Sequence, residues 1–317
     1  MHAARRQADP TFLVGAERSG TTVFRLMLDS HPLLAWANEL EFAVDMMPHH
    51  QGWPPLEEYY EFLSTHRIFL AGGYRIDQRL DYLELMNSFL EQRARRAGKA
   101  RVGATVHRHF DRLLRIWPDA RFIHIVRDPR DVAHSCIRMG WAGNVWTGAR
   151  RWVAAERLWD ELLETIPAAR RIDVRYEELI RSTEAVLTRV CQFIGIPYDP
   201  RMLDYPSRTT YEHPDRSLTE QWRTTFSERE LRLVEARTGP LLTARGYEPS
   251  GLPPLHVTRR IKLLLQIQDR WARFRYSLAL FGPRLRLANT FSRRLGLKSW
   301  QRSVRLRMNA IAQENLK

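Results

Sequence analysis

The stretch Thr-Phe-Leu-Val-Gly-Ala-Glu-Arg-Ser-Gly-Thr-Thr at residues 11–22 decides the fold class. Residues 11–16 form a short apolar run that ends at Gly15, and such a run predicts a buried strand. Apolar residues then recur at helical spacing over 23–27, and His31-Pro32 ends this predicted helix. A strand, a glycine-rich turn and a helix in this order indicate the opening of an α/β domain that binds phosphate.

The turn nearly matches the loop that binds nucleoside triphosphates, G-x-x-x-x-G-K-[ST]. Thr21 stands where that loop has its lysine, and Arg18 lies two residues before the second glycine. Backbone N–H groups at the start of the following helix favour a bound anion. We therefore expect a phosphate site without the ATP machinery, and its candidate residues are Ala16, Glu17, Arg18, Ser19, Gly20, Thr21 and Thr22. The alternative is an ordinary strand-to-helix turn that binds nothing.

A second apolar run, residues 121–126, is followed by Asp128-Pro129, a good N-cap and first-turn proline. Arg127 stands at the end of this predicted strand, and Ser135 follows about two helical turns later. We expect these two side chains to hold a second phosphate together. The alternative is that Arg127 pairs with the acids beside it while Ser135 faces the sheet.

Strands and helices alternate along the body of the chain. Residues 172–176 predict a third strand, and the two acids that follow favour the start of a helix. The prediction is an α/β fold of the P-loop nucleotide-binding type, with a mostly parallel central sheet and helices on both faces. Residues 45–100 predict a helical insertion on the acceptor side, and residues 200–225 predict a loop.

Positive charge is concentrated at the C-terminal end. Residues 252–317 hold 15 Lys and Arg and two acids, a net charge of +13, whereas the whole chain carries +14. We therefore divide the chain into a catalytic domain, 11–251, and a basic amphipathic helical extension, 252–317. Basic helices that carry Trp, Phe and Leu suit an anionic membrane surface. Packing on the body or in a homo-oligomer is the alternative, and nucleic acid is disfavoured because the aromatics form a packing stripe.

Composition and spacing exclude several classes of protein. The two cysteines rule out a disulfide framework and a zinc ribbon, and no apolar run reaches the roughly 20 residues of a membrane span. Residues 1–10 lack the apolar core of a secretory signal, so we expect a cytoplasmic protein. Peripheral attachment to the inner face of the membrane is the location to expect if the basic extension binds lipid. His107-Arg-His109 and His49-His50 lack a third ligand, so we expect no metal.

The motifs resemble the two signatures of sulfotransferases that use 3′-phosphoadenosine 5′-phosphosulfate (PAPS). Arg18-Ser-Gly-Thr-Thr22 is similar to their 5′-phosphosulfate loop, and Arg127-Asp-Pro-Arg-Asp131 with Ser135 is similar to their 3′-phosphate site. Residues 11–32 resemble the tyrosylprotein and glycan branches most. The resemblance continues through residues 174–179, 191–196 and 246–247, and it covers about residues 11–250.

The resemblance implies roles for several residues. Glu39 aligns with the carboxylate that acts as general base, with Glu41 in reserve, and Arg18 stabilises the 5′-phosphate as charge develops. Tyr176 corresponds to a residue near the adenine. Trp222 falls in a loop that closes over the nucleotide, or else packs in the core. Relatives carry a catalytic lysine in the stretch where this chain has Ala104-Thr105-Val106. Either His107, Arg108, Lys99 or Arg101 replaces that cation, or the cation is missing.

The predicted function is transfer of a sulfuryl group from PAPS to an acceptor hydroxyl by in-line displacement, leaving adenosine 3′,5′-bisphosphate. A glycan or glycolipid is the first choice of acceptor, and a protein tyrosine or a small molecule is the second. A P-loop kinase is disfavoured by the missing loop lysine. A non-catalytic membrane- or polymer-binding protein with a degenerate nucleotide fold is the alternative outside enzymes.

Overall fold

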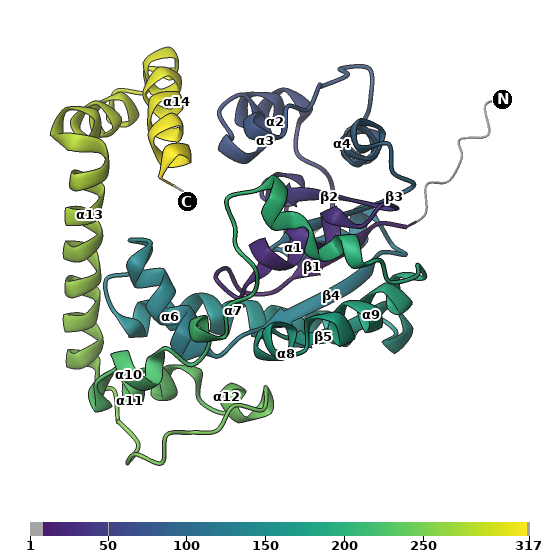
Figure 1. Cartoon of the computed structure of the whole chain (residues 1–317). Coiled ribbons are helices and arrows are strands. Elements are labelled where there is room, and N and C mark those ends of the chain that lie inside the picture. Colours follow the sequence, from purple (N-terminus) through teal and green to yellow (C-terminus); the bar gives the residue numbers. More distant parts are fainter. Residues whose placement is uncertain (1–8, 50, 316–317) are drawn as a thin grey trace.

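A computed structural model describes residues 9–49 and 51–315, so His50 and most of the N-terminal segment searched for a signal lie outside it (Figure 1). Five parallel strands form the central sheet in the order β2-β3-β1-β4-β5. The strands are β1 (Thr11–Val14), β2 (Leu34–Glu39), β3 (Arg101–Val106), β4 (Arg121–Val126) and β5 (Arg171–Arg175). The three predicted strands correspond to β1, β4 and β5, and the predicted fold class is confirmed.

Helices pack on both sides of this sheet (Figure 1). They are α1 (Thr21–Ser30), α2 (Leu56–Leu63), α3 (Arg67–Gly72), α4 (Tyr82–Ala97), α5 (Leu113–Ile116), α6 (Pro129–Arg138), α7 (Val145–Leu163), α8 (Tyr176–Arg181), α9 (Thr183–Ile194), α10 (Trp222–Thr225), α11 (Glu228–Thr238), α12 (Leu241–Ala244), α13 (Arg259–Arg294) and α14 (Lys298–Glu314). Successive side chains of β1 enter different cores, as the period of two in a strand requires. Phe12 and Val14 pack with α4, whereas Leu13 packs with α1, α8 and α9.

The sequence did not predict β2 and β3, because neither shows a strong strand pattern. The surroundings of Gly103 explain why β3 lacks a strong strand pattern. A Cβ built there would lie 2.3 Å from the ring of Trp36 and 2.7 Å from the carbonyl oxygen of Thr11. The close packing of Trp36 therefore requires a residue with low strand propensity at this position.

The predicted insertion and the predicted C-terminal extension are both helical. The insertion contains α2, α3 and α4, and the extension contains α13 and α14. α13 bends at Gly282-Pro283, where Gly282 has φ 71°, and α14 turns back toward α3 (Figure 1). The predicted loop at 200–225 consists of short 3-10 turns before α10. None of the helices in the described ranges combines the length and the apolar character of a membrane span.

Candidate active site

The two predicted phosphate motifs meet at the carboxyl edge of the sheet. β1 and β4 are neighbouring parallel strands, so the loops that follow them lie side by side. Nε of Arg18 donates to Oγ of Ser135 at 2.8 Å, across 117 residues of sequence. Nη1 of Arg127 donates to the carbonyl oxygen of Arg18 at 3.1 Å. The two motifs therefore form one site.

The loop between β1 and α1 depends on left-handed backbone. Arg18 has φ 70° and Gly20 has φ 86°. A Cβ on Gly20 would lie 2.2 Å from the ring of Tyr176, so only glycine fits there. Tyr176 is buried, and the guanidinium of Arg127 lies 4.6 Å from the centre of its ring. Tyr176 therefore shapes the loop and positions Arg127, while its predicted place beside the adenine stays a prediction.

Unpaired polar atoms in this loop fit phosphate groups. Oγ of Ser19 is fully buried and has no hydrogen-bond partner among the described residues, and the same holds for Nε of Arg127. Gly20 gives α1 no side-chain cap, which leaves N–H groups of its first turn without a partner in the helix. Buried polar groups without partners are rare in folded proteins, and the phosphates of PAPS would satisfy these donors.

The helix of the second motif begins as predicted, but Arg127 also contacts other groups of the protein. Asp128 caps α6 by accepting from the N–H of Arg130 at 2.9 Å, and Ser135 faces Arg18. Nη2 of Arg127 donates to the carbonyl oxygen of Leu218 at 2.5 Å and lies 3.6 Å from Asp131. Burial raises the pKa of Asp131 to about 6 although Arg127 opposes the shift. The predicted phosphate site and the alternative ion pair thus share one arginine.

The segment before α10 covers this motif. Asp131 accepts hydrogen bonds from the backbone N–H groups of Glu220, at 2.8 Å, and Trp222, at 3.1 Å. The Trp222 ring is buried against Arg130, whose guanidinium carbon lies 3.7 Å from the ring centre. Burial of the ring is compatible with the core-packing alternative for Trp222, although its neighbour here is a charged side chain. Closure of its loop over a nucleotide stays a prediction.

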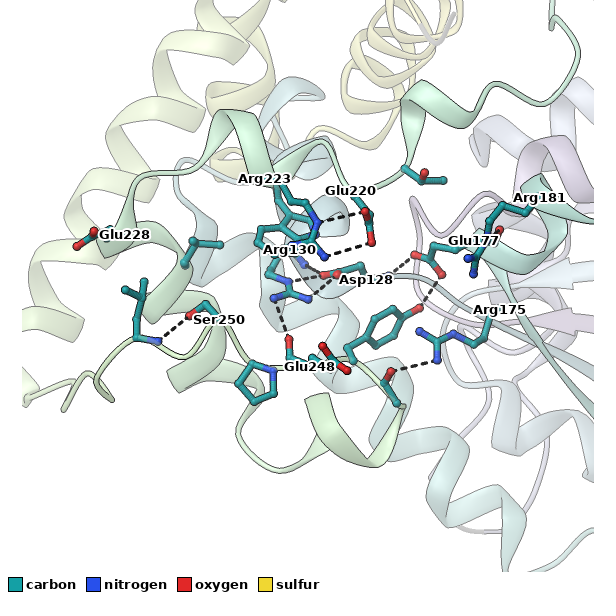
Figure 2. Close-up of a pocket in the computed structure, with 17 residues that line it drawn as sticks. Asp128, Arg130, Arg175, Glu177, Arg181, Glu220, Arg223, Glu228, Glu248 and Ser250 are labelled. Atoms are coloured by element: carbon teal, nitrogen blue, oxygen red, sulfur yellow. Dashed lines mark hydrogen bonds and ion pairs between the residues drawn. The ribbon is translucent and has the colours of Figure 1, made fainter.

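A cavity of about 580 Å³ borders the same segment, and Figure 2 shows its charged lining. Arg130 pairs with Asp128 at 2.7 Å. Glu177 accepts from the Asp128 N–H at 3.0 Å and from the hydroxyl of Tyr247 at 2.9 Å. These side chains satisfy one another's hydrogen bonds and charges, so we infer that they stabilise the second motif.

A cleft of about 650 Å³ opens beside the first motif. Its lining includes Arg18 from the loop, Glu39 from the end of β2, and Glu41. The structure therefore brings both candidate bases and the candidate phosphate arginine to one cavity. Burial lowers the pKa of Arg18, but a guanidinium stays cationic at neutral pH.

The environment of Glu41 separates it from Glu39. Glu41 is buried, its Oε1 accepts from the His107 N–H at 3.0 Å, and its Oε2 has no partner among the described residues. Burial raises the pKa of Glu41 from 4.5 to about 7; His107 and Arg108 oppose this shift and Glu39 adds to it. Glu41 therefore exchanges a proton near neutral pH.

The structure places the four cations that could replace the missing lysine. His107 and Arg108 follow β3 and line the cleft, and Arg108 pairs with Asp45 at 2.7 Å. Lys99 and Arg101 lie at the opposite end of β3, where Lys99 donates to the Leu34 carbonyl oxygen at 3.2 Å. His107 and Arg108 are therefore the two candidates that reach the site.

Sequence reasoning missed the far wall of the cleft, to which α14 contributes Arg305, Asn309 and Gln313. Arg305 donates to the Thr65 hydroxyl at 3.3 Å, and Asn309 donates to the Thr65 carbonyl oxygen at 2.8 Å. Arg67 donates to Gln313 at 2.8 Å. Residues so distant in sequence from the loop carry no local signal of this role. Among residues 9–49 and 51–315, no group of three or more His, Cys, Asp or Glu is placed to hold a metal ion.

Comparison with known proteins identifies the class. The model of the sulfotransferase family matches residues 10–200, and the chain belongs to this family. The prediction of a sulfotransferase is thereby confirmed, and the kinase alternative is set aside. PAPS is the donor that this membership implies.

Similar proteins include protein-tyrosine sulfotransferase A of Caenorhabditis elegans, 24% identical over 270 residues, which are 77% of this chain and 68% of that protein. Protein-tyrosine sulfotransferase 2 of Gallus gallus is 25% identical over 276 residues, 77% of this chain and 70% of that protein. The omega-hydroxy-beta-dihydromenaquinone-9 sulfotransferase Stf3 of Mycobacterium tuberculosis is 30% identical over 164 residues, 45% of this chain and 40% of that protein. The sulfotransferase domain of the curacin biosynthetic pathway has the same fold, with a TM-score of 0.53, 18% identity and coverage of 77% of this chain and 99% of that one.

Removing either phosphate arginine should abolish tight nucleotide binding. We expect Arg18→Ala and Arg127→Ala each to raise the Kd of adenosine 3′,5′-bisphosphate by about 10- to 100-fold, because each removes a charge-assisted hydrogen bond. Isothermal titration calorimetry without metal measures this change. Arg229→Ala, an exposed arginine of α11, is the control and should bind like the parent protein. Equal affinity in all four proteins would contradict the assignment.

The buried carboxyl of Glu41 should make stability fall as pH rises. The folded protein holds this proton more tightly than the unfolded chain between pH 4.5 and about 7, so deprotonation favours unfolding in that window. We expect the free energy of unfolding of the parent, relative to Glu41→Gln, to drop by about 2 kcal/mol from pH 5 to pH 8. Urea titrations of both proteins measure it. Glu57→Gln on α2 should show no such change, and parallel pH profiles for parent and Glu41→Gln would refute the shift.

Proposed function

We propose that this sulfotransferase acts on the phenolic hydroxyl of tyrosine in an acidic peptide, with Glu39 as general base. One observation carries the proposal: Glu39 and Arg18 line the same cleft, and arginines outnumber carboxylates among its lining residues. Two protein-tyrosine sulfotransferases among the relatives support a tyrosine acceptor over the glycan that the sequence favoured.

The arginines of the cleft support an acidic acceptor. Arg108 and Arg151 have carboxylate partners, Asp45 at 2.7 Å and Glu17 at 2.6 Å. Three others donate to neutral groups instead: Arg25 to Asn38 at 2.7 Å, Arg67 to Gln313 at 2.8 Å and Arg305 to Thr65 at 3.3 Å. Their positive charge is available to carboxylates that flank an acceptor tyrosine.

The chemistry needs positioning, a base and stabilisation of the leaving group. Glu39 takes the proton from the acceptor hydroxyl as its oxygen attacks sulfur. The bond between sulfur and the 5′-phosphate oxygen breaks, and Arg18 stabilises the charge that develops there. Adenosine 3′,5′-bisphosphate leaves, and the acceptor carries a sulfate ester. His107 and Arg108 line the same cleft and are the candidates to take the part of the lysine that relatives carry.

A hydroxyl carried by a membrane lipid or glycolipid is the second candidate. The basic helix α13 and the relative named for a menaquinone acceptor favour it. This candidate retains the glycolipid acceptor expected from the sequence.

An acceptor assay with radiolabelled PAPS tests the proposal. An acidic peptide with one tyrosine should become labelled, and the same peptide with phenylalanine should not. A dihydromenaquinone analogue and a neutral glycan provide the competing acceptors. Labelling of either one in preference to the tyrosine peptide would overturn the tyrosine assignment.

Replacing the base should slow the chemical step alone. We expect Glu39→Gln to lower kcat by about 10²- to 10⁴-fold, since proton transfer by a positioned carboxylate contributes about that much. The Kd of adenosine 3′,5′-bisphosphate should stay unchanged. Glu41→Gln is the matched variant, and it should retain most of the activity. A larger loss of kcat in Glu41→Gln than in Glu39→Gln would assign the base to Glu41.

Reversing one charge on the α14 wall should weaken acceptor binding. We expect Arg305→Glu to raise the KM for the acidic peptide about tenfold or more, because attraction becomes repulsion in the cleft. Nucleotide affinity should not change. Arg307→Glu, an exposed arginine two residues further along α14, makes the same charge change outside the cleft lining and is the control. Equal KM values for the two variants would rule out a specific role for Arg305.

A further inference from the structure

One face of α13 is fixed on the body of the protein. Leu265 and Asp269 are buried there. Nδ2 of Asn144 donates to the Leu265 carbonyl oxygen at 2.8 Å, and the N–H of Gly143 donates to Asp269 at 2.8 Å. These contacts decide which face of the helix points outward.

The opposite face of α13 carries an exposed apolar stripe. Leu263, Ile267 and Trp271 follow one another at intervals of four residues and are 57%, 54% and 62% exposed. The neighbouring Leu264 is 65% exposed, and Phe274 stacks on Trp271 with ring centres 5.9 Å apart. Large apolar side chains gathered on one surface mark an interaction site.

The same helix is strongly basic along its first half, which carries Arg259, Arg260, Lys262, Arg270, Arg273 and Arg275. Asp269 is the single acid of the sequence from residue 252 to residue 313, and it lies on the buried face. Arg273 pairs with Asp269 at 3.6 Å, and the other five basic side chains are exposed without an ion-pair partner among the described residues. The outward face therefore combines apolar and cationic side chains.

We propose that this outward face of α13 binds the surface of an anionic membrane. Acyl chains accept the Leu, Ile and Trp side chains, and lipid phosphates pair with the arginines. A second copy of the chain fits less well, because a twofold contact through this face would bring two sets of like charges together. Nucleic acid would satisfy the charges but leave the apolar stripe in water.

Membrane binding by α13 would suit either candidate acceptor. α13 leads directly into α14, and α14 walls the acceptor cleft. Binding of α13 to a membrane would therefore hold the cleft close to that surface, for a membrane-anchored protein or a lipid acceptor alike.

Vesicle flotation of the full-length protein tests the proposal. Vesicles of phosphatidylcholine with 30% phosphatidylglycerol should carry the protein, and vesicles of phosphatidylcholine alone should carry at least tenfold less. We expect Ile267→Gln with Trp271→Gln to weaken binding at least tenfold, and Arg259→Glu with Arg260→Glu to do the same. Leu33→Ser, which removes an apolar side chain 43% exposed before β2, is the control. Melting temperature and nucleotide affinity of each variant show that it folds.

Flotation and light scattering together distinguish membrane binding from self-association. Binding to anionic vesicles that both double variants lose and that 0.5 M NaCl weakens supports it. Failure to float, or equal flotation of the parent and the Ile267/Trp271 variant, refutes it. A dimer in light scattering that this variant dissociates, without vesicle binding, also refutes it and assigns the face to self-association.

Discussion

The contact between Arg18 and the second motif is the constraint on which the site depends. Arg18 donates to Ser135, and its own carbonyl oxygen accepts from Arg127, so the two phosphate motifs hold each other in place. Arg18 and Gly20 both have left-handed backbone in this turn. Residue 20 must be glycine because the Tyr176 ring occupies the space that a Cβ would need. The parallel pairing of β1 and β4 brings the two loops within reach. The sheet, the turn and the second motif therefore act as one unit.

Two carboxyl groups two residues apart show how the fold separates roles. Both line the cleft, but Glu39 is half-buried at the end of β2, whereas Glu41 is buried and accepts from the His107 N–H. Burial keeps a proton on Glu41 to higher pH and so makes it a poorer permanent anion. The proposed base is Glu39 because an acceptor hydroxyl that enters the cleft can reach its more accessible carboxylate.

The C-terminal extension contributes to the molecule in two different ways. Through α14 it supplies Arg305, Asn309 and Gln313 to the cleft and ties itself to the segment around Thr65. Through α13 it packs one face on the body and leaves an apolar, cationic face outward. A segment that composition separates from the catalytic domain is thus part of the wall of the cleft.

Short local patterns were enough to predict the fold class and the enzyme family and to mark the two motifs, because a strand, a glycine turn and a capped helix each leave a local signal. They did not reveal β2 and β3, since Gly103 and the residues around Trp36 are chosen by packing across strands. Long-range packing keeps Lys99 and Arg101 away from the site, places Trp222 on Arg130 and brings Arg305 to the cleft. Those facts depend on which distant segments come together, and no spacing along the chain encodes that. The sequence showed a basic amphipathic tail, but the buried position of Asp269 decided which of its faces is free.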